Sequence, residues 1–253
     1  MTRLSIQTLQ GLPIIHGGDD LCVLIADAMT RAKVSLSDGD IVVVAQKIVS
    51  LAEGRLVRLS DVRPSARALE LAAETEKDPR IVELILTESV DIVRTKPGVI
   101  IARHRLGIVG ANAGIDQSNI DHVDGECALL LPENPDQSAR NLREALAGQT
   151  GLRIGVIISD SMNRPWRLGS VGIAIGSAGL DVLDDRRGHT DLFGRELKVT
   201  ISNRADAIAA AAVLLMGETT DRTPVAIVSG LAGENSEQKA ADSIRPEPDD
   251  MFL

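Results

Sequence analysis

GVIISDSMNRPWRLGSVGIAIGSAG, residues 155–179, begins as an apolar run of strand type that stops at Asp160 and Ser161. A carboxylate and a hydroxyl on a rigid support are oxygen ligands that suit a hard metal ion. The same two residues could instead cap the segment that follows them, and the stretch itself favours neither interpretation. Arg164 and Arg167 come next and are candidate phosphate clamps, so the stretch indicates chemistry on a phosphorylated substrate.

Glycines recur in the second half of this stretch. Gly169, Gly172, Gly176 and Gly179 have the spacing that would line one face of a helix, where a second backbone can approach closely, and packing is the default interpretation. The chain contains neither a GxGxxG pattern here nor GxxxxGK followed by Ser or Thr. The common dinucleotide-binding and P-loop motifs are therefore absent, and a bound nucleotide would need a less common phosphate-binding loop.

Composition excludes several classes of protein. The 253 residues are 44% hydrophobic, so the chain can bury a sizeable core. Its aromatic residues are one Trp and two Phe, and its formal net charge is −9. Nucleic-acid binding is disfavoured because stacking platforms and a basic surface are both missing. We expect a cytoplasmic protein, because no apolar run could span a bilayer and the N-terminus lacks the apolar region of a signal peptide.

Metal-binding cysteines and covalent catalysis are also disfavoured. Cys22 and Cys127 lack the spacing of a zinc site or a disulfide framework, and buried structural thiols are expected. The four histidines have no metal spacing and are expected to be solvated or packed: His16, His104, His122 and His189. No Gly-x-Ser-x-Gly elbow occurs.

Helical and strand-like segments are interleaved without regular βαβ spacing, which predicts an α+β fold with mixed or antiparallel sheets and flanking helices. Strands are predicted at 4–9, 39–50, 127–132, 152–159, 197–203 and 224–230, with a hairpin at 99–116. Helices are predicted at 21–32, 65–76, 80–93, 138–147 and 204–216. We assign residues 1–235 to one domain without a visible internal boundary, and by composition residues 236–253 are a flexible tail.

Two further loops carry acidic side chains. NAGIDQSN, residues 112–119, offers Asp116, Ser118 and Asn119 as oxygen ligands, although an Asx turn explains such a loop more simply. MGETTDRT, residues 216–223, follows the helix predicted at 204–216 and carries Glu218 and Asp221. Acidic residues there oppose the helix dipole, which favours a functional role over a solvated loop.

Several motifs together identify a family. They are GLPII from Gly11, VVAQKIVSLAEGR from Val43, NAGIDQSN, SDSMNRPWRLG, IAIGSAG, DLFGRELKVT and LLMGE. In this order they resemble the coenzyme F420-0:L-glutamate ligases, over about Leu9 to Leu231. The ending RPEPDDMF is similar to the close of the ligase region in bacterial members, which implies an ordered C-terminus.

The resemblance implies a GTP-dependent ligase with Mg²⁺ or Mn²⁺, and with K⁺ as a further candidate ion. Such enzymes join L-glutamate to the lactate carboxylate of coenzyme F420-0 through an acyl phosphate, and can add further γ-linked glutamates. The resemblance also implies an intertwined homodimer with two lobes per chain. The number of glutamates and the general base are not implied, and no catalytic residue is assigned.

Site residues follow from the same resemblance. The metal ligands fall on Asp116, Asp160, Ser161 and Glu218, which are the acidic loops found above. The GTP contacts fall on Gly11, Leu12, Pro13, Ile14, Gln46, Lys47, Asn119, Met216, Gly217, Glu218, Thr219, Thr220, Asp221, Arg222 and Thr223. Arg164 and Arg167 are assigned from their chemistry alone, and they could contact the phosphodiester of the substrate, the γ-phosphate or a neighbouring subunit.

One departure from the family bears on the nucleotide. Where the family commonly has S-K-A-E-G-R, this chain has Leu51 in place of the lysine, and Lys47 is the candidate substitute. Two alternatives to the F420-0 ligase are a paralogue that ligates or hydrolyses another substrate, and a GTP-binding protein without catalysis.

Overall fold

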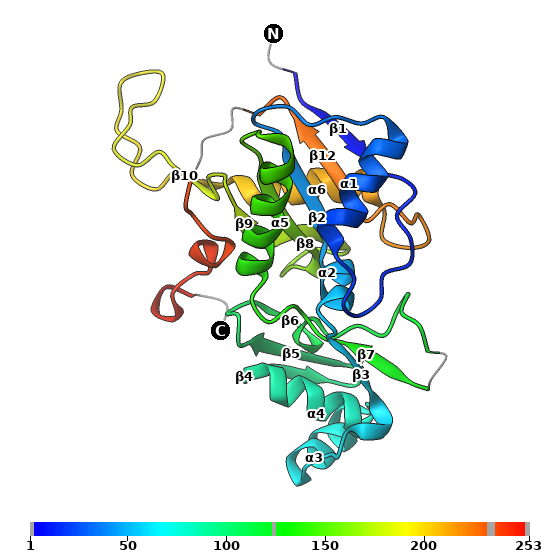
Figure 1. Ribbon diagram of the computed structural model, residues 1–253. Helices are drawn as coiled ribbons and strands as arrows, with labels where there is room; N and C mark the ends of the chain where they lie inside the picture. Colours follow the sequence, from blue (N-terminus) through cyan, green and yellow to red (C-terminus); the bar gives the residue numbers. More distant parts are fainter. Residues whose placement is uncertain (1–2, 123–124, 232–235, 251–253) are drawn as a thin grey trace.

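The computed structural model describes residues 3–122, 125–231 and 236–250, and a five-stranded mixed sheet lies at its centre (Figure 1). In spatial order its strands are β1 (Ser5–Thr8), β12 (Val225–Ser229), β2 (Ile41–Ala45), β8 (Gly155–Asn163) and β9 (Ser170–Ala178). The pair β2 and β8 is parallel, and the other neighbours are antiparallel. The mixed sheet confirms the predicted α+β class.

Helices cover both faces of this sheet, which explains why its central strands read as continuous apolar runs. Val42 and Val44 pack with the helices α1 (Leu21–Ala32) and α5 (Pro135–Thr150). Val43 points the other way and packs with α6 (Arg204–Met216). The two-residue period of a strand thus divides the buried side chains between two cores.

A third core surrounds a smaller sheet that the chain forms between β2 and β8. Its strands are β4 (Ser89–Lys96), β5 (Val99–His104) and β6 (Val109–Ala111), packed with α3 (Ala66–Thr75) and α4 (Pro79–Glu88). The short pair β3 (Leu56–Arg58) and β7 (Cys127–Leu129) leads into and out of this region, with 3-10 turns at η1 (Leu59–Asp61) and η2 (Asn112–Gly114). Figure 1 shows this region beneath the five-stranded sheet.

Two peripheral segments complete the described chain. Between β10 (Leu183–Asp185) and β11 (Ile201–Asn203), residues 186–200 form an arm that projects away from the sheets (Figure 1, yellow). Residues 236–250 contain η3 (Ala240–Ser243) and η4 (Glu247–Asp249). They are not the flexible tail that composition favours, because the buried Asp136 of α5 accepts hydrogen bonds from the backbone of Ala240 and Ala241.

Several predicted boundaries were wrong. The strand predicted over 39–50 ends at Ala45, where α2 (Gln46–Ala52) begins. The helix predicted over 80–93 ends at Glu88, because the following residues pair with β5 as β4. The helix predicted over 138–147 begins earlier, since the Asn134 side chain caps it and Pro135 suits its first turn.

The stretch 155–179 forms a hairpin of β8 and β9. The strand does not stop at Asp160 but continues through Asn163, so Asp160 and Ser161 do not cap a following segment. Gly172 and Gly176 lie on β9 rather than on a helix, and Gly169 and Gly179 flank that strand. Close packing is confirmed at Gly172, Gly176 and Gly179, whereas a Cβ at Gly169 would meet open space. A Cβ at Gly172 would meet the Ala209 carbonyl of α6, and one at Gly176 would meet Pro135 of α5.

Among residues 3–122, 125–231 and 236–250, no helix has the length and apolar character needed to cross a membrane.

Candidate functional site

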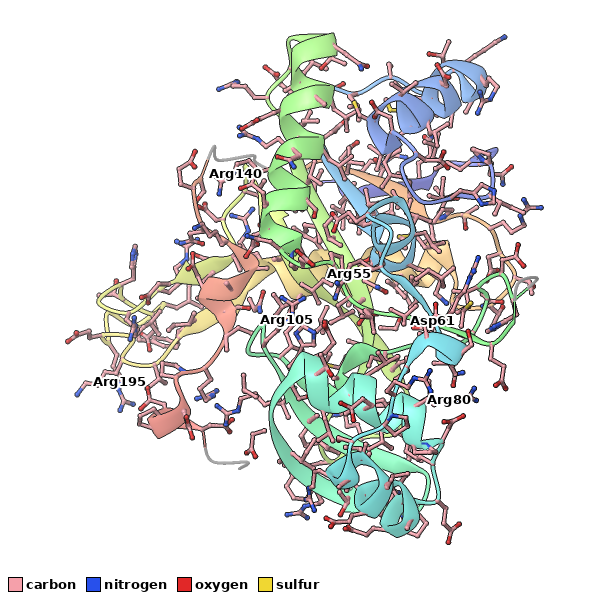
Figure 2. All side chains as sticks on the ribbon, turned by 60° about the horizontal axis from the view of Figure 1, so that its bottom comes forward. Arg55, Asp61, Arg80, Arg105, Arg140 and Arg195 are labelled. Atoms are coloured by element: carbon pink, nitrogen blue, oxygen red, sulfur yellow. The ribbon has the colours of Figure 1, made fainter. Side chains whose placement is uncertain are left out.

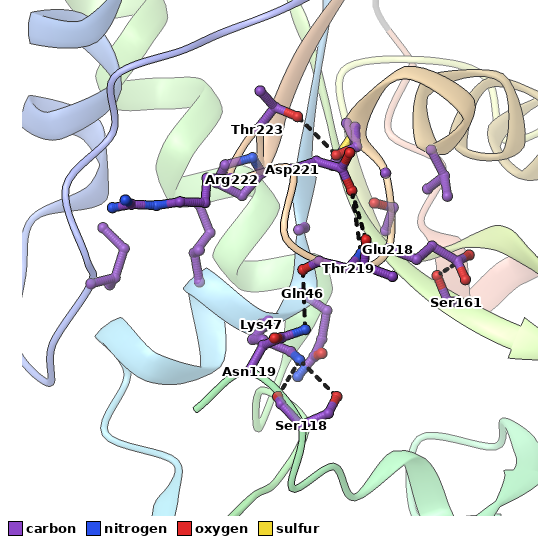
Figure 3. Close-up of a pocket in the computed structure, with 18 of the residues that line it drawn as sticks. Gln46, Lys47, Ser118, Asn119, Ser161, Glu218, Thr219, Asp221, Arg222 and Thr223 are labelled. Atoms are coloured by element: carbon purple, nitrogen blue, oxygen red, sulfur yellow. Dashed lines mark hydrogen bonds between the residues drawn. The ribbon is translucent and has the colours of Figure 1, made fainter. Parts of the chain in front are cut away.

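A cavity of about 640 Å³ opens where β2 gives way to α2. Five segments that are distant in sequence line it: 12–15, 45–51, 114–119, 159–161 and 213–224. Figure 3 shows their polar side chains converging from the helix α2, the Ser118 loop, β8 and the loop after α6. Two ends can be distinguished, an apolar one and an acidic one.

The apolar end is formed by Leu12, Ile15, Ile48 and Leu51. These side chains continue into the core that α1 and α5 share, so this wall is held by packing. Leu51, where the resemblance implies a lysine, lies here.

The acidic end begins with Asp116 and Lys47. The Lys47 ammonium lies 2.8 Å from Asp116 Oδ2 and donates to the Ser118 carbonyl at 2.6 Å. The Ser118 amide donates to Asp116 Oδ1 at 2.7 Å, so the Asx turn is present. Burial would raise the pKa of Asp116, but the bonds from Lys47 and Ser118 hold it below its ordinary value. Asp116 therefore faces the cavity as an ionised carboxylate and also shapes its own loop.

Asp160 lies on β8 in the same end of the cavity. Burial raises the pKa of its carboxyl to about 6, and the negative charges of Asp116 and Glu218 act in the same direction. The Ser161 amide donates to Asp160 Oδ1 at 2.8 Å and opposes the shift in part. Three carboxylates thus share a space that contains one ammonium group, and a bound cation would relieve their repulsion.

Glu218 closes the acidic end from the loop after α6. Its two carboxylate oxygens accept hydrogen bonds from the Ser161 and Ser170 hydroxyls, each at 2.8 Å. The same loop is tied to the Asx turn, because the Asn119 side-chain amide donates to the Thr219 carbonyl at 3.2 Å (Figure 3). The three acidic loops found in the sequence therefore meet at one place.

Metal ions fit this end by donor chemistry rather than by preformed geometry. Within the described part of the chain, no group of three or more His, Cys, Asp or Glu side chains is arranged to hold a metal ion. Instead, the Lys47 ammonium is paired with Asp116, and the hydroxyls of Ser161 and Ser170 donate hydrogen bonds to Glu218. The donors are nevertheless hard oxygens with excess negative charge, as Mg²⁺ and Mn²⁺ require, and a metal would replace these partners.

The structure gathers most of the predicted site residues. All four predicted metal ligands line the cavity, and so do the predicted nucleotide contacts except Gly11, whose carbonyl accepts from Arg31 at 3.0 Å. Arg164 and Arg167 lie outside the lining, on the turn between β8 and β9. Ser170 was missed by sequence reasoning, because its role depends on the β-hairpin register that pairs it with Asn163.

Comparison with known proteins gives consistent matches. A family model described as F420-0:Gamma-glutamyl ligase matches residues 11–230. Relatives named Coenzyme F420:L-glutamate ligase include that of Methanothermobacter thermautotrophicus, 45% identical over 227 residues, covering 90% of this chain and 89% of the relative. Those of Methanopyrus kandleri and Methanocaldococcus jannaschii are 46% and 43% identical, covering 94% and 95% of this chain and 93% and 94% of the relatives.

Proposed function

The chain belongs to the F420-0:gamma-glutamyl ligase family, and we propose that it joins L-glutamate to the lactate carboxylate of coenzyme F420-0 with cleavage of GTP. Membership places it among the ligases of coenzyme F420 biosynthesis. The observation that carries the proposal is the cavity, in which the three acidic loops and Lys47 meet beside an apolar wall. The name that its relatives share supports glutamate and a coenzyme F420 species as the proposed substrates.

The two ends of the cavity suit the two ends of a nucleoside triphosphate. Leu12, Ile48 and Leu51 offer apolar contact for a purine, and Lys47 offers a cation for the phosphates. Three carboxylates would repel a bare triphosphate, so its phosphates can lie at the acidic end only together with divalent cations. The arrangement therefore favours a metal–GTP complex as the bound species.

The reaction that fits this arrangement proceeds in two steps. A lactate carboxylate oxygen attacks the γ-phosphorus, GDP leaves, and an acyl phosphate forms. The glutamate amine then attacks the acyl carbon, inorganic phosphate leaves, and the nitrogen loses a proton. Asp116, Asp160, Ser161 and Glu218 would hold the divalent metal, which when bound neutralises charge on the transferring phosphoryl group. Lys47 and the loop after α6 would position the nucleotide. Repetition of the two steps with further L-glutamate would add γ-linked glutamates.

The proposal is tested by incubating the protein with F420-0, L-glutamate, GTP and Mn²⁺, followed by mass spectrometry. We expect a product that is heavier by one or more glutamyl residues, together with GDP. Unconsumed GTP and unmodified F420-0 would refute the proposal. GTP consumption without a glutamylated product would instead support hydrolysis or another acceptor, and omission of K⁺ would show whether that ion contributes.

Lys47 is expected to supply the cation that Leu51 does not. Lys47→Met should raise the KM for GTP by about tenfold, because a phosphate contact of roughly 1.4 kcal/mol is lost. Steady-state kinetics with GTP varied would measure this. Lys96→Met, at an exposed end of β4, is the matched control and should leave that KM unchanged. Equal values for wild type and Lys47→Met would remove Lys47 from the nucleotide site.

A homodimer is part of the proposal, and the arm offers apolar surface for it. Leu192 and Phe193 at its tip are 98% and 94% exposed, and Val199 is 86% exposed. Large apolar side chains gathered on a projecting segment are typical of a subunit interface. We expect a dimer by light scattering after size exclusion, and a shift towards monomer in Phe193→Asp. A monomeric wild-type protein would contradict this part of the proposal.

A further inference from the structure

The turn that joins β8 to β9 carries an unusual side chain. We call residues 164–169 the hairpin tip; they lie between Asn163 and Ser170, the last pair of the hairpin. Trp166, the only tryptophan of the chain, lies on this tip and is 89% exposed. Its φ of 66° is a backbone conformation that bulky residues rarely adopt. A large aromatic residue that is exposed on such a backbone indicates a role in ligand binding rather than in stabilising the fold, because strained positions concentrate at ligand sites.

Two arginines flank this indole. Arg164 Nη1 donates only to the Gly169 carbonyl, at 3.3 Å, and within the described chain neither Arg164 nor Arg167 forms an ion pair. Several other arginines are paired with carboxylates; Arg187 on the arm, for example, lies 2.6 Å from Asp185. The hairpin tip therefore combines an exposed aromatic ring with two guanidinium groups whose charge is uncompensated. That combination is complementary to an aromatic anion.

The hairpin tip lies beside the acidic end of the cavity. Ser161 and Ser170, on the two strands at its base, both donate to Glu218. Trp166 follows Ser161 by five residues, so at most about 17 Å of chain separates them. A ligand that projects from the acidic end therefore passes within reach of the hairpin tip.

We propose that the hairpin tip binds the distal part of the acceptor substrate, with Trp166 stacked on its planar deazaflavin ring and Arg164 and Arg167 at its phosphodiester. This inference rests on the proposed function. The reacting carboxylate must lie at the acidic end, and with the nucleotide in the cavity the rest of the acceptor extends outward. The phosphodiester is repelled by Asp116, Asp160 and Glu218, so its binding needs cations beyond them, and the hairpin tip supplies two.

A kinetic test separates this role from a structural one. Trp166→Ala should raise the KM for F420-0 by about tenfold to a hundredfold, because a base-like ring loses its stacking partner. Trp166→Phe should restore most of the affinity, and the KM for GTP should stay unchanged in both variants. Leu69→Ala, which shortens an exposed apolar side chain on α3, is the control and should alter neither constant.

A binding test uses the single tryptophan as its own probe. In wild type, F420-0 should quench the tryptophan fluorescence in a saturable way. The same deazaflavin without its phospholactate arm should quench it with lower affinity. Arg164→Gln and Arg167→Gln should weaken binding of F420-0 but leave that of the truncated ring unchanged, because only the former carries the phosphodiester.

Three outcomes would overturn the inference. One is an unchanged KM for F420-0 in Trp166→Ala while wild type is active, which leaves the proposed function intact. Another is dissociation of the dimer in Trp166→Ala with unaltered F420-0 affinity, which would make the hairpin tip a subunit contact. The third is a wild-type protein that neither binds nor glutamylates F420-0, which would refute the proposed function as well.

Discussion

Asp160→Asn is expected to lower the rate of GTP-dependent glutamate ligation by about a thousandfold or more, the size of effect seen when charge stabilisation is removed at a transferring group. Asp160 is the carboxylate that Asp116 and Glu218 both influence, and burial keeps the pKa of its carboxyl at about 6. A neutral amide of nearly the same shape keeps the β8 backbone but removes the charge that would hold the metal. The measurement is kcat/KM for GTP, first at the Mn²⁺ concentration that saturates wild type and then at a higher Mn²⁺ concentration.

The fold should survive this change. In the metal-free protein the Asp160 carboxylate is repelled by two others, so its neutralisation should leave the melting temperature in a chelator unchanged or higher. Asp27→Asn, on the exposed face of α1, is the control and should keep both rate and melting temperature. Wild-type rates in Asp160→Asn would remove Asp160 from the site, and loss of folding would leave its role to be measured in Asp160→Glu.

Glu88→Gln is expected to reduce the free energy of unfolding by about 3 kcal/mol, as breaking a buried ion pair does. Glu88 is buried at the end of α4 and lies 2.9 Å from Arg55 and 3.2 Å from Arg105. Figure 2 shows these two arginines close together above the helices α3 and α4. His104 adds a third contact at 3.3 Å; since its Nδ1 accepts from the Leu106 amide, its Nε2 carries the proton that is shared with Glu88. An amide would remove the carboxylate charge that Arg55 and Arg105 share, and Arg55 would keep only its pair with the exposed Glu133 at 3.2 Å.

The effect should depend on pH in a defined direction. Burial alone would raise the pKa of Glu88, but the bond from His104 and the charges of Arg55 and Arg105 lower it to about 2. A depressed carboxyl pKa stabilises the fold at pH values above the unfolded pKa of about 4.5, and this stabilisation is lost as the pH falls towards 2. The difference between wild type and Glu88→Gln should therefore be full at pH 7 and shrink below about pH 4.5.

Urea unfolding at pH 7 and at pH 3 would measure this dependence. Glu70→Gln is the control, because Glu70 pairs with Arg67 on the surface of α3, where both side chains are largely exposed. A Glu88→Gln protein as stable as wild type at pH 7 would contradict the account. A difference that grows on acidification would contradict the assigned sign.

The sequence predicted the elements whose signals are local. The helices at 21–32 and 204–216 were found with their observed bounds, because the first has Asp20 as its cap and the second is rich in alanine, a strong helix former. The acidic residues were found because Asp116 and Glu218 lie in polar loops and Asp160 follows an apolar run of the sequence, although β8 continues past it. The motif series identified the family, which the comparisons confirm.

What the sequence could not supply depends on pairing across the chain. The strand β4 was missed because its partner β5 decides its conformation over helical propensity. Gly172 and Gly176 have helix-like spacing, and only their pairing with β8 shows that they lie on a strand. The contact of Ser170 with Glu218 and the exposure of Trp166 likewise follow from the hairpin register.

The most direct test of the central claim follows the oxygen atoms of the acceptor. F420-0 labelled with oxygen-18 in its lactate carboxylate is incubated with the protein, GTP, L-glutamate and Mn²⁺, and both products are analysed by mass spectrometry. Activation through an acyl phosphate predicts one oxygen-18 atom in the released phosphate and one in the new amide. Unlabelled phosphate beside a glutamylated product would contradict the acyl-phosphate route, and the absence of any glutamylated product would contradict the assignment as an F420-0:L-glutamate ligase.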